Sequence, residues 1–211
     1  MANTFAPFGF LQYQGGAGGA PTFAQSTRRI ASTYSTAIFF GDPVIPATSS
    51  ATGYIIRGAT DGTTVVAGIF VGCQYLSVAQ KRTVWSRYWP GSDASGDVIA
   101  YVIDDPNSRF LVQTSGSSFY NANATSSTIA SLPIGQYVTF NIGTGNTSTG
   151  QSGAYLDATA TAVGSPFVIV NYVFDPPGQN GTDPTTNYPY VVVGFNNEVW
   201  RTNGAGPTGI S

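Results

Sequence analysis

The sequence predicts an all-β protein, either a sandwich or a jelly-roll-like barrel, with an extended N-terminal arm. Three observations lead to this prediction. Short runs of β-branched and aromatic residues recur along the 211 residues and end at turn signals. The composition retains residues that build sheets and turns, with 13 Phe, 12 Tyr, 26 Gly and 13 Pro. No repeat of fixed period appears, which disfavours propellers and solenoids.

Residues 1–35 form the predicted arm. Aromatic side chains there precede the glycine-rich run 15–21, which is typical of a flexible tether. Such aromatics either fold back on the parent core or dock into a neighbour. Docking is favoured because exposed aromatics on a lone monomer promote aggregation. Removal of residues 1–20 is therefore expected to leave a folded domain. The arm supplies four predicted contact residues for a shell or a second protomer: Phe5, Phe8, Phe10 and Tyr13.

A single all-β domain is predicted over residues 36–202, followed by an extended tail, 203–211. Its first strand, 36–40, ends at the turn signal Gly41-Asp42-Pro43. The next two runs, 53–57 and 64–71, are joined through Asp61-Gly62, which is a hairpin signal.

Residues 83–89 alternate, which places one set of side chains on each face of a strand. Val84, Ser86 and Tyr88 then share one face. The other face carries Trp85, Arg87 and Trp89.

The second half of the domain continues the pattern. Residues 98–103 are almost entirely apolar, as in a strand covered on both faces. The polar glycine-rich run 143–153 is predicted to be a loop with little fixed structure of its own. Short helical turns are conceivable only at 127–132 and 158–162. The remaining predicted strands are 109–113, 136–142, 167–174, and a last pair, 190–195 and 198–201, joined through Asn196-Asn197.

Charge is scarce in this chain. Charged residues make up 9%, the formal net charge is −2, and the eight Lys and Arg are spread along the sequence. This disfavours nucleic acid as a partner and leaves only a modest barrier to self-association. No secretory signal and no apolar run near the roughly 20 residues of a membrane helix is visible. We expect a soluble protein made in a cytoplasm, with no membrane partner.

The side chains that usually perform catalysis are largely missing. There is no histidine, and Cys73 lies in an apolar run, where we expect a buried, unreactive thiol. We therefore predict no enzyme, no catalytic residue, no cofactor and no metal; the oxygen-rich loop 175–183 reads as solvated. Asp104 and Asp105 are adjacent, and neighbouring strand residues face opposite ways, so the two carboxylates cannot easily share a proton as a catalytic pair. Because Pro106-Asn107 follows them, they are predicted to form a turn. The remaining enzyme alternative is a glycosidase. Its candidate carboxylates are Asp42, Asp104, Asp105, Asp157, Asp175, Asp183 and Glu198.

The densest aromatic cluster is Trp85, Tyr88 and Trp89 with Arg87. One face of it is expected in the core. The opposite face is either an interface anchor, because Trp, Tyr and Arg dominate binding hot spots, or a sugar-stacking platform. Arg87 and Trp89 are the predicted second contact patch. Lys81, Arg82 and Arg87 form a local basic cluster, which reads as a solvated strand face or the rim of a protein contact.

Four segments carry a resemblance to a known group. The stretch 64–91, the opening 1–10, and the segments 41–44 and 104–107 resemble small tailed-bacteriophage virion proteins, which are similar to head decoration (cement) proteins encoded near the major capsid protein. The resemblance implies a structural virion protein on the capsid exterior that stabilises the shell. Its implied partners are the major capsid protein and itself, as a dimer or trimer. The alternative functions are a receptor- or glycan-binding module of a phage tail or surface protein, and a self-assembling shell subunit.

Overall fold

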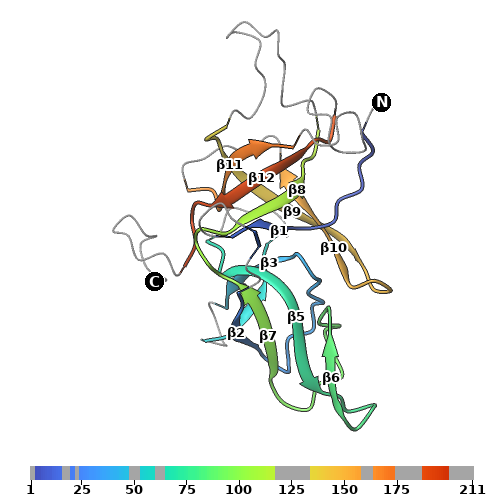
Figure 1. The fold of residues 1–211 in the computed structure, drawn as a ribbon. Helices are drawn as coiled ribbons and strands as arrows, with labels where there is room; N and C mark the ends of the chain where they lie inside the picture. Colours follow the sequence, from blue (N-terminus) through green and yellow to red (C-terminus); the bar gives the residue numbers. More distant parts are fainter. Residues whose placement is uncertain are drawn as a thin grey trace, which may run out of the picture.

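The protein consists of two antiparallel β-sheets, one above the other in Figure 1. In this computed structural model, all secondary-structure elements of the described residues are β-strands, so the all-β prediction is confirmed. The structure describes residues 3–15, 20–21, 24–47, 53–59, 65–116, 134–157, 164–173 and 187–199.

The first sheet has six strands in the order β1-β8-β12-β11-β9-β10. Their bounds are β1 Leu11–Gln14, β8 Arg109–Gln113, β9 Tyr137–Asn146, β10 Gln151–Asp157, β11 Phe167–Tyr172 and β12 Tyr190–Phe195. A parallel bridge between Thr114 and Leu156 brings β10 back to the end of β8, so the sheet curls. Its core is rich in phenylalanine. The ring of Phe167 stacks on that of Phe195 at 5.7 Å, and Phe110 meets Phe195 edge-on at 5.1 Å.

The second sheet has the order β2-β7-β5-β3-β4, and β6 pairs with β5 beside this path. The bounds are β2 Ser26–Ile30, β3 Pro43–Pro46, β4 Ile55–Arg57, β5 Gly68–Leu76, β6 Thr83–Ser86 and β7 Val98–Ile103. The end strands β2 and β4 approach each other, so this sheet forms a half-barrel around its own core. That core includes Phe70 and Trp89, both fully buried.

Strand β5 joins the two cores. Ile69 belongs to the core of the first sheet, whereas Phe70, Cys73 and Tyr75 belong to the core of the half-barrel. The chain also crosses from β7 in the second sheet to β8 in the first through the turn at Asp105 and Ser108. The sheets are therefore connected by continuous backbone as well as by packing.

The extended N-terminal arm is not confirmed. Strand β1 pairs with β8 and strand β2 pairs with β7, although both lie within residues 1–35. Residues 3–10, called the strap below, lie against the first sheet. The Gly9 N–H donates to Ala154 O at 3.1 Å, and the Gln113 side chain binds both Thr4 O and the Ala6 N–H at 2.8 Å. Removal of residues 1–20 would delete β1 and the core residue Phe10, so the expectation that a folded domain remains is corrected.

The predicted pairing of 53–57 with 64–71 is wrong. Strand β4 pairs with β3, and β3 pairs with β5, so β3 lies between the two predicted partners. The predicted strand 36–40 is reduced to isolated bridges at Ile38 and Phe40, and the chain becomes a strand only after the turn at Gly41. The Asp61-Gly62 signal lies outside the described residues.

The prediction of a structureless loop at 143–153 is also wrong. These residues form the end of β9, a turn, and the start of β10. Asn146 organises the turn, since its side-chain oxygen accepts from Ser148 N–H at 2.9 Å and its carbonyl accepts from Gly150 N–H at 2.8 Å. A Cβ at Gly145 would overlap the Phe39 ring. The glycine here permits close packing of the hairpin on the loop that leads into β3.

The last predicted pair does not form as expected. Strand β12 lies between β8 and β11, and Glu198 bridges to Val66 instead of pairing with β12. The conceivable helical turns at 127–132 and 158–162, and the tail 203–211, lie outside the described residues.

Candidate interaction surfaces

The six predicted contact residues divide between surface and core. Phe5 and Tyr13 are 42% and 44% exposed, Phe8 is half-buried and Arg87 is exposed. Phe10 and Trp89, in contrast, are 1% and 0% exposed. These two predictions are corrected: both side chains belong to the protein's own core.

Phe10 is buried because the strap turns inward at Gly9. This glycine has φ +78°, and a Cβ there would lie 2.7 Å from the Ser152 Cβ, so the close approach requires glycine. The Phe10 N–H then donates to Gly41 O at 2.9 Å, and its ring stacks on Phe167 at 4.5 Å. Earlier in the strap, Thr4, Phe5 and Ala6 remain exposed.

Trp89 is buried because β6 ends at Ser86. The Ser86 hydroxyl accepts from the Tyr88 N–H at 3.2 Å and donates to Tyr88 O at 2.5 Å, which bends the chain. The strict alternation predicted for 83–89 is broken there, so Trp89 no longer shares a face with Trp85. Its indole N–H donates to Tyr34 O at 3.1 Å inside the half-barrel.

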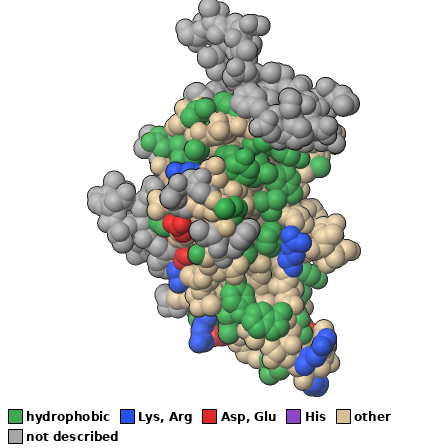
Figure 2. All heavy atoms as spheres, viewed as in Figure 1, with side chains coloured by type: hydrophobic (Ala, Val, Ile, Leu, Met, Phe, Trp, Pro, Cys, Tyr) green, Lys and Arg blue, Asp and Glu red, His purple; other side chains and the backbone are tan. Residues whose placement is uncertain are grey.

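An aromatic surface covers the first sheet where the strap crosses it. The Phe5 ring meets Tyr155 edge-on at 5.1 Å and Tyr188 at 5.0 Å, and the Phe8 ring meets Tyr190 edge-on at 5.1 Å. We call these five residues the strap surface. Figure 2 shows apolar side chains gathered over this upper sheet, with few charged ones among them. Of the two alternatives for the aromatic residues of the arm, the structure shows folding back on the parent sheet, with part of the aromatic area left exposed.

A second aromatic surface lies on the outer face of the half-barrel. Cross-strand partners share a face of a sheet, so the register defines the rows of side chains. Gln74 pairs with Trp85 on one side and with Ile99 on the other. Trp85 is 67% exposed and stacks on Tyr101, with ring centroids 5.7 Å apart and planes 12° apart. Figure 2 shows apolar side chains on the surface of the lower sheet as well.

The prediction that residues 98–103 form a strand covered on both faces is wrong. Val98, Ala100 and Val102 point into the half-barrel core, whereas Ile99 is 42% exposed. The strand is covered on one face only. A continuous apolar run does not distinguish these cases, because it contains no polar residue to mark the solvent side.

A groove crosses this outer face at Gly72, which has no side chain. Tyr101 pairs with Gly72, so the position beside its ring is empty. The groove has a volume of about 390 Å³ and is open to solvent; its lining residues are Gln25, Val71, Gly72, Cys73, Trp85, Ser86, Arg87 and Tyr101. We call it the Gly72 groove. The sequence indicated Trp85 and Arg87, but Tyr101 and Gly72 are brought in by strand pairing alone.

Arg87 is held at the edge of the groove by its other neighbours. Its guanidinium carbon lies 4.2 Å from the centre of the Phe40 ring, and its Nη2 donates to Gln151 Oε1 at 3.1 Å. The two contacts hold the guanidinium of Arg87, one of the residues that line the groove, in a fixed position. Of the predicted basic cluster, Lys81 and Arg82 lie in the β5–β6 turn, where Ser77 N–H donates to Arg82 O.

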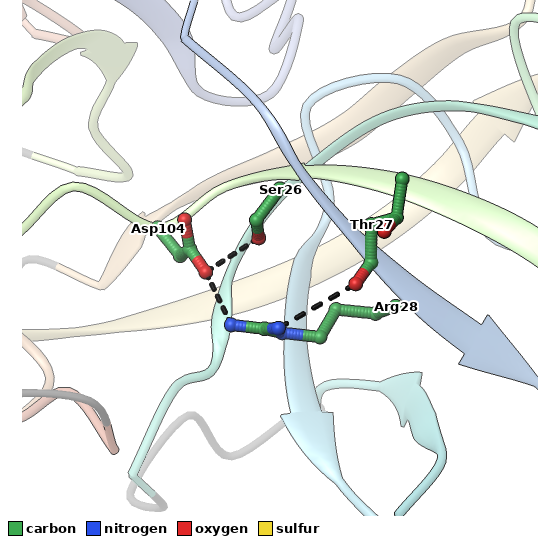
Figure 3. A network of polar contacts seen from close by, with 4 residues as sticks. All are labelled: Ser26, Thr27, Arg28 and Asp104. Atoms are coloured by element: carbon green, nitrogen blue, oxygen red, sulfur yellow. Dashed lines mark hydrogen bonds and ion pairs between the residues drawn. The ribbon is translucent and has the colours of Figure 1, made fainter.

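The adjacent acids Asp104 and Asp105 serve different partners. Asp104 Oδ2 accepts from Ser26 Oγ and from Arg28 Nη2, each at 2.5 Å, which ties the end of β7 to β2 (Figure 3). Asp105 Oδ1 accepts from the Asn107 N–H at 2.9 Å within its own turn. The turn-forming prediction is confirmed for Asp105, while Asp104 forms an ion pair between strands.

Asp42 is the buried acid at the junction of the two sheets. It accepts from the Phe39 N–H at 2.8 Å and from Ser152 Oγ at 2.5 Å. Burial raises the pKa of its carboxyl from 3.8 to about 6, although these hydrogen bonds and the charge of Arg57 oppose the rise. Its neighbour Gly41 provides the carbonyl that holds Phe10, so Asp42 supports the strap.

The remaining candidate groups from the sequence are the thiol of Cys73 and the carboxylates not described above. Cys73 is buried as predicted, and burial raises the pKa of its thiol to about 12. Asp157 Oδ2 accepts from Asn141 Nδ2 at 3.1 Å, and Glu198 is buried. Asp175, Asp183 and the loop 175–183 lie outside the described residues.

Among the described residues, no group of three or more Cys, Asp or Glu side chains is placed to hold a metal ion. Within the same residues, no helix has the length and apolarity to cross a bilayer.

Comparison with known proteins gives no relative for this chain. No protein-family model, no curated protein and no solved structure matches it.

Proposed function

We propose that this protein is a structural virion protein that binds the outside of a phage capsid and stabilises the shell. The observation that carries the proposal is the strap surface, in which Phe5 remains 42% exposed on a framework of tyrosine rings. The resemblance of four sequence segments to small tailed-phage virion proteins supplies the identity of the partner.

The strap surface suits a protein partner for two physical reasons. Aromatic rings supply large contact areas at low conformational cost, and Tyr is enriched in binding hot spots. The rings are also pre-positioned, because the Gln113 side chain holds the backbone of Thr4 and Ala6 in place. Little ordering entropy is then lost on binding.

Repetition strengthens such a contact. A weak interface copied over a symmetric shell, and within a dimer or trimer of this protein, gains affinity through effective concentration. The low charge of the chain, 9% of residues, keeps the electrostatic cost of close packing small. Both self-association and capsid binding are parts of the proposal.

The test is add-back of purified protein to phage heads that lack it, with copies per head measured by quantitative mass spectrometry. Phe5→Asp should lower occupancy at least about tenfold, because a charge would be buried against the shell. Leu76→Asp is the matched control, since Leu76 is 48% exposed but lies on the other sheet. Equal occupancy of Phe5→Asp and wild type would overturn the strap surface as the contact, and failure of wild-type protein to bind heads would overturn the function.

A receptor- or glycan-binding role is the second candidate function. It is favoured by a specific observation, the Gly72 groove beside the exposed Trp85 ring.

A further inference from the structure

We propose that the Gly72 groove binds a sugar ring that carries a carboxylate, that is, a hexuronic acid unit of a glycan. The inference goes beyond shell binding and concerns the sheet opposite the strap surface. It rests on three features of the groove: an aromatic wall, a space of suitable size, and a fixed positive charge.

The aromatic wall is formed by Trp85 and Tyr101. The Tyr101 ring stacks on Trp85, with planes 12° apart, and this contact supports the indole although it is 67% exposed. A second contact steadies Tyr101, whose hydroxyl lies 3.1 Å from Gln74 Oε1. A pyranose ring has one face of C–H groups, and this apolar face is complementary to the face of an aromatic ring.

The space next to this wall exists because residue 72 is glycine. Gly72 has φ +149° and sits at an irregularity in the pairing of β5 with β7. Its absent side chain leaves the floor of the groove open. The volume of about 390 Å³ lies within the roughly 300–1,000 Å³ typical of small-molecule sites.

The charged and polar residues that line the groove indicate which class of ligand it binds. Arg87 is the positively charged residue among them, and no Asp or Glu is among the described lining residues. The guanidinium has five N–H donors, and its position is fixed by Phe40 and Gln151. It therefore offers a positioned partner for a carboxylate. Gln25 and Ser86 add neutral groups that can exchange hydrogen bonds with sugar hydroxyls.

A second copy of this chain fits the groove less well. A two-fold dimer through this face would bring the same patch of each copy together. Where the two-fold axis passes through the groove, Arg87 of one copy lies near Arg87 of the other, and like charges in a contact are unfavourable. A small anionic ligand avoids this repulsion.

The experiment uses the full-length protein with trigalacturonic acid and with its neutral methyl ester as probes. Binding is measured by isothermal titration and by the shift of the Trp85 indole signal in ¹H–¹⁵N spectra. The acid should bind with a Kd on the order of 1 mM and the ester at least about fivefold more weakly. Trp85→Ala should weaken acid binding about five- to tenfold, because the stacking contact is lost.

Two further variants separate the roles of the residues. Arg87→Gln should abolish the preference for the acid over the ester while binding of the ester persists. Leu76→Ala, an exposed apolar residue on β5 that does not line the groove, should bind like the wild type. Circular dichroism confirms that each variant is folded.

Any of four results would overturn the proposal. The first three are absence of binding of both probes at about 10 mM, equal binding of acid and ester by the wild type, and undiminished binding by Trp85→Ala. Dissociation of an oligomer by Trp85→Ala in size-exclusion chromatography would also overturn it, since the face would then be a contact between copies. None of these results bears on the strap surface, so the capsid proposal is tested separately.

Discussion

The strap and the segment 83–89 both divide their aromatic side chains between surface and core, but by different means. In the strap, Phe5 stays outside and Phe10 is buried, and the change occurs at Gly9, with φ +78°. In the segment 83–89, Trp85 stays outside and Trp89 is buried, and the change occurs at a side-chain hydrogen bond of Ser86.

The difference shows how much each site depends on its surroundings. The strap is held by groups distant in sequence, among them Gly41 and Gln113. The bend after β6 is made by residues two positions apart, Ser86 and Tyr88. We therefore expect the strap to depend on the whole fold, and the bend to be largely a local property of the chain.

The largest expected effect is the contrast between Phe10→Ala and Phe5→Ala. Phe10→Ala should lower the free energy of unfolding by about 3–5 kcal/mol, because a cavity would form beside Phe167. Phe5→Ala should lower it by less than about 1 kcal/mol, because that ring is already 42% exposed. Urea unfolding measures both values. Similar losses for the two variants would mean that the strap does not divide its rings as described.

The second prediction concerns the pH dependence of the strap's support. Because the pKa of Asp42 is raised to about 6, the folded protein binds this proton more tightly than the unfolded chain does. The contribution is fully present below the unfolded pKa of 3.8 and is lost as the pH rises through 6. The free energy of unfolding should fall by on the order of 3 kcal/mol across this window from this group.

Asp42→Asn tests this assignment. The amide oxygen can still accept from the Phe39 N–H, but the side chain no longer titrates. Urea midpoints measured from about pH 4 to pH 8 should show a flatter profile for the variant. Parallel profiles for the variant and the wild type would exclude Asp42 as the source of the dependence.

The smallest expected effect is that of Ser86→Ala. Loss of the hydroxyl that binds Tyr88 should lower the free energy of unfolding by about 1 kcal/mol and red-shift the tryptophan emission as Trp89 loosens. Thr83→Ala, on the exposed face of the same strand, should change the stability by less than about 0.5 kcal/mol. An unchanged emission spectrum for Ser86→Ala would show that packing around Trp89, not the bend, orients the indole.

The fold class and several elements follow from the sequence alone. The runs 109–113 and 190–195, which contain β-branched and aromatic residues, form strands with those bounds, because a pleated surface favours such residues. The burial of Cys73 also followed from its apolar neighbours. The turn at Asp105 followed from the residues that form it, since an Asp side chain binds the backbone two residues on.

Which strands are neighbours and which aromatic rings are exposed depends on contacts between residues far apart in the chain. β3 separates β4 from β5, and Gly72 meets Tyr101, through pairings between residues far apart in the chain. Gly145 read as flexible in the sequence, yet it is the contact point for the Phe39 ring. A glycine gives the same sequence signal whether it loosens a loop or admits a neighbour, because the difference lies in what packs against it.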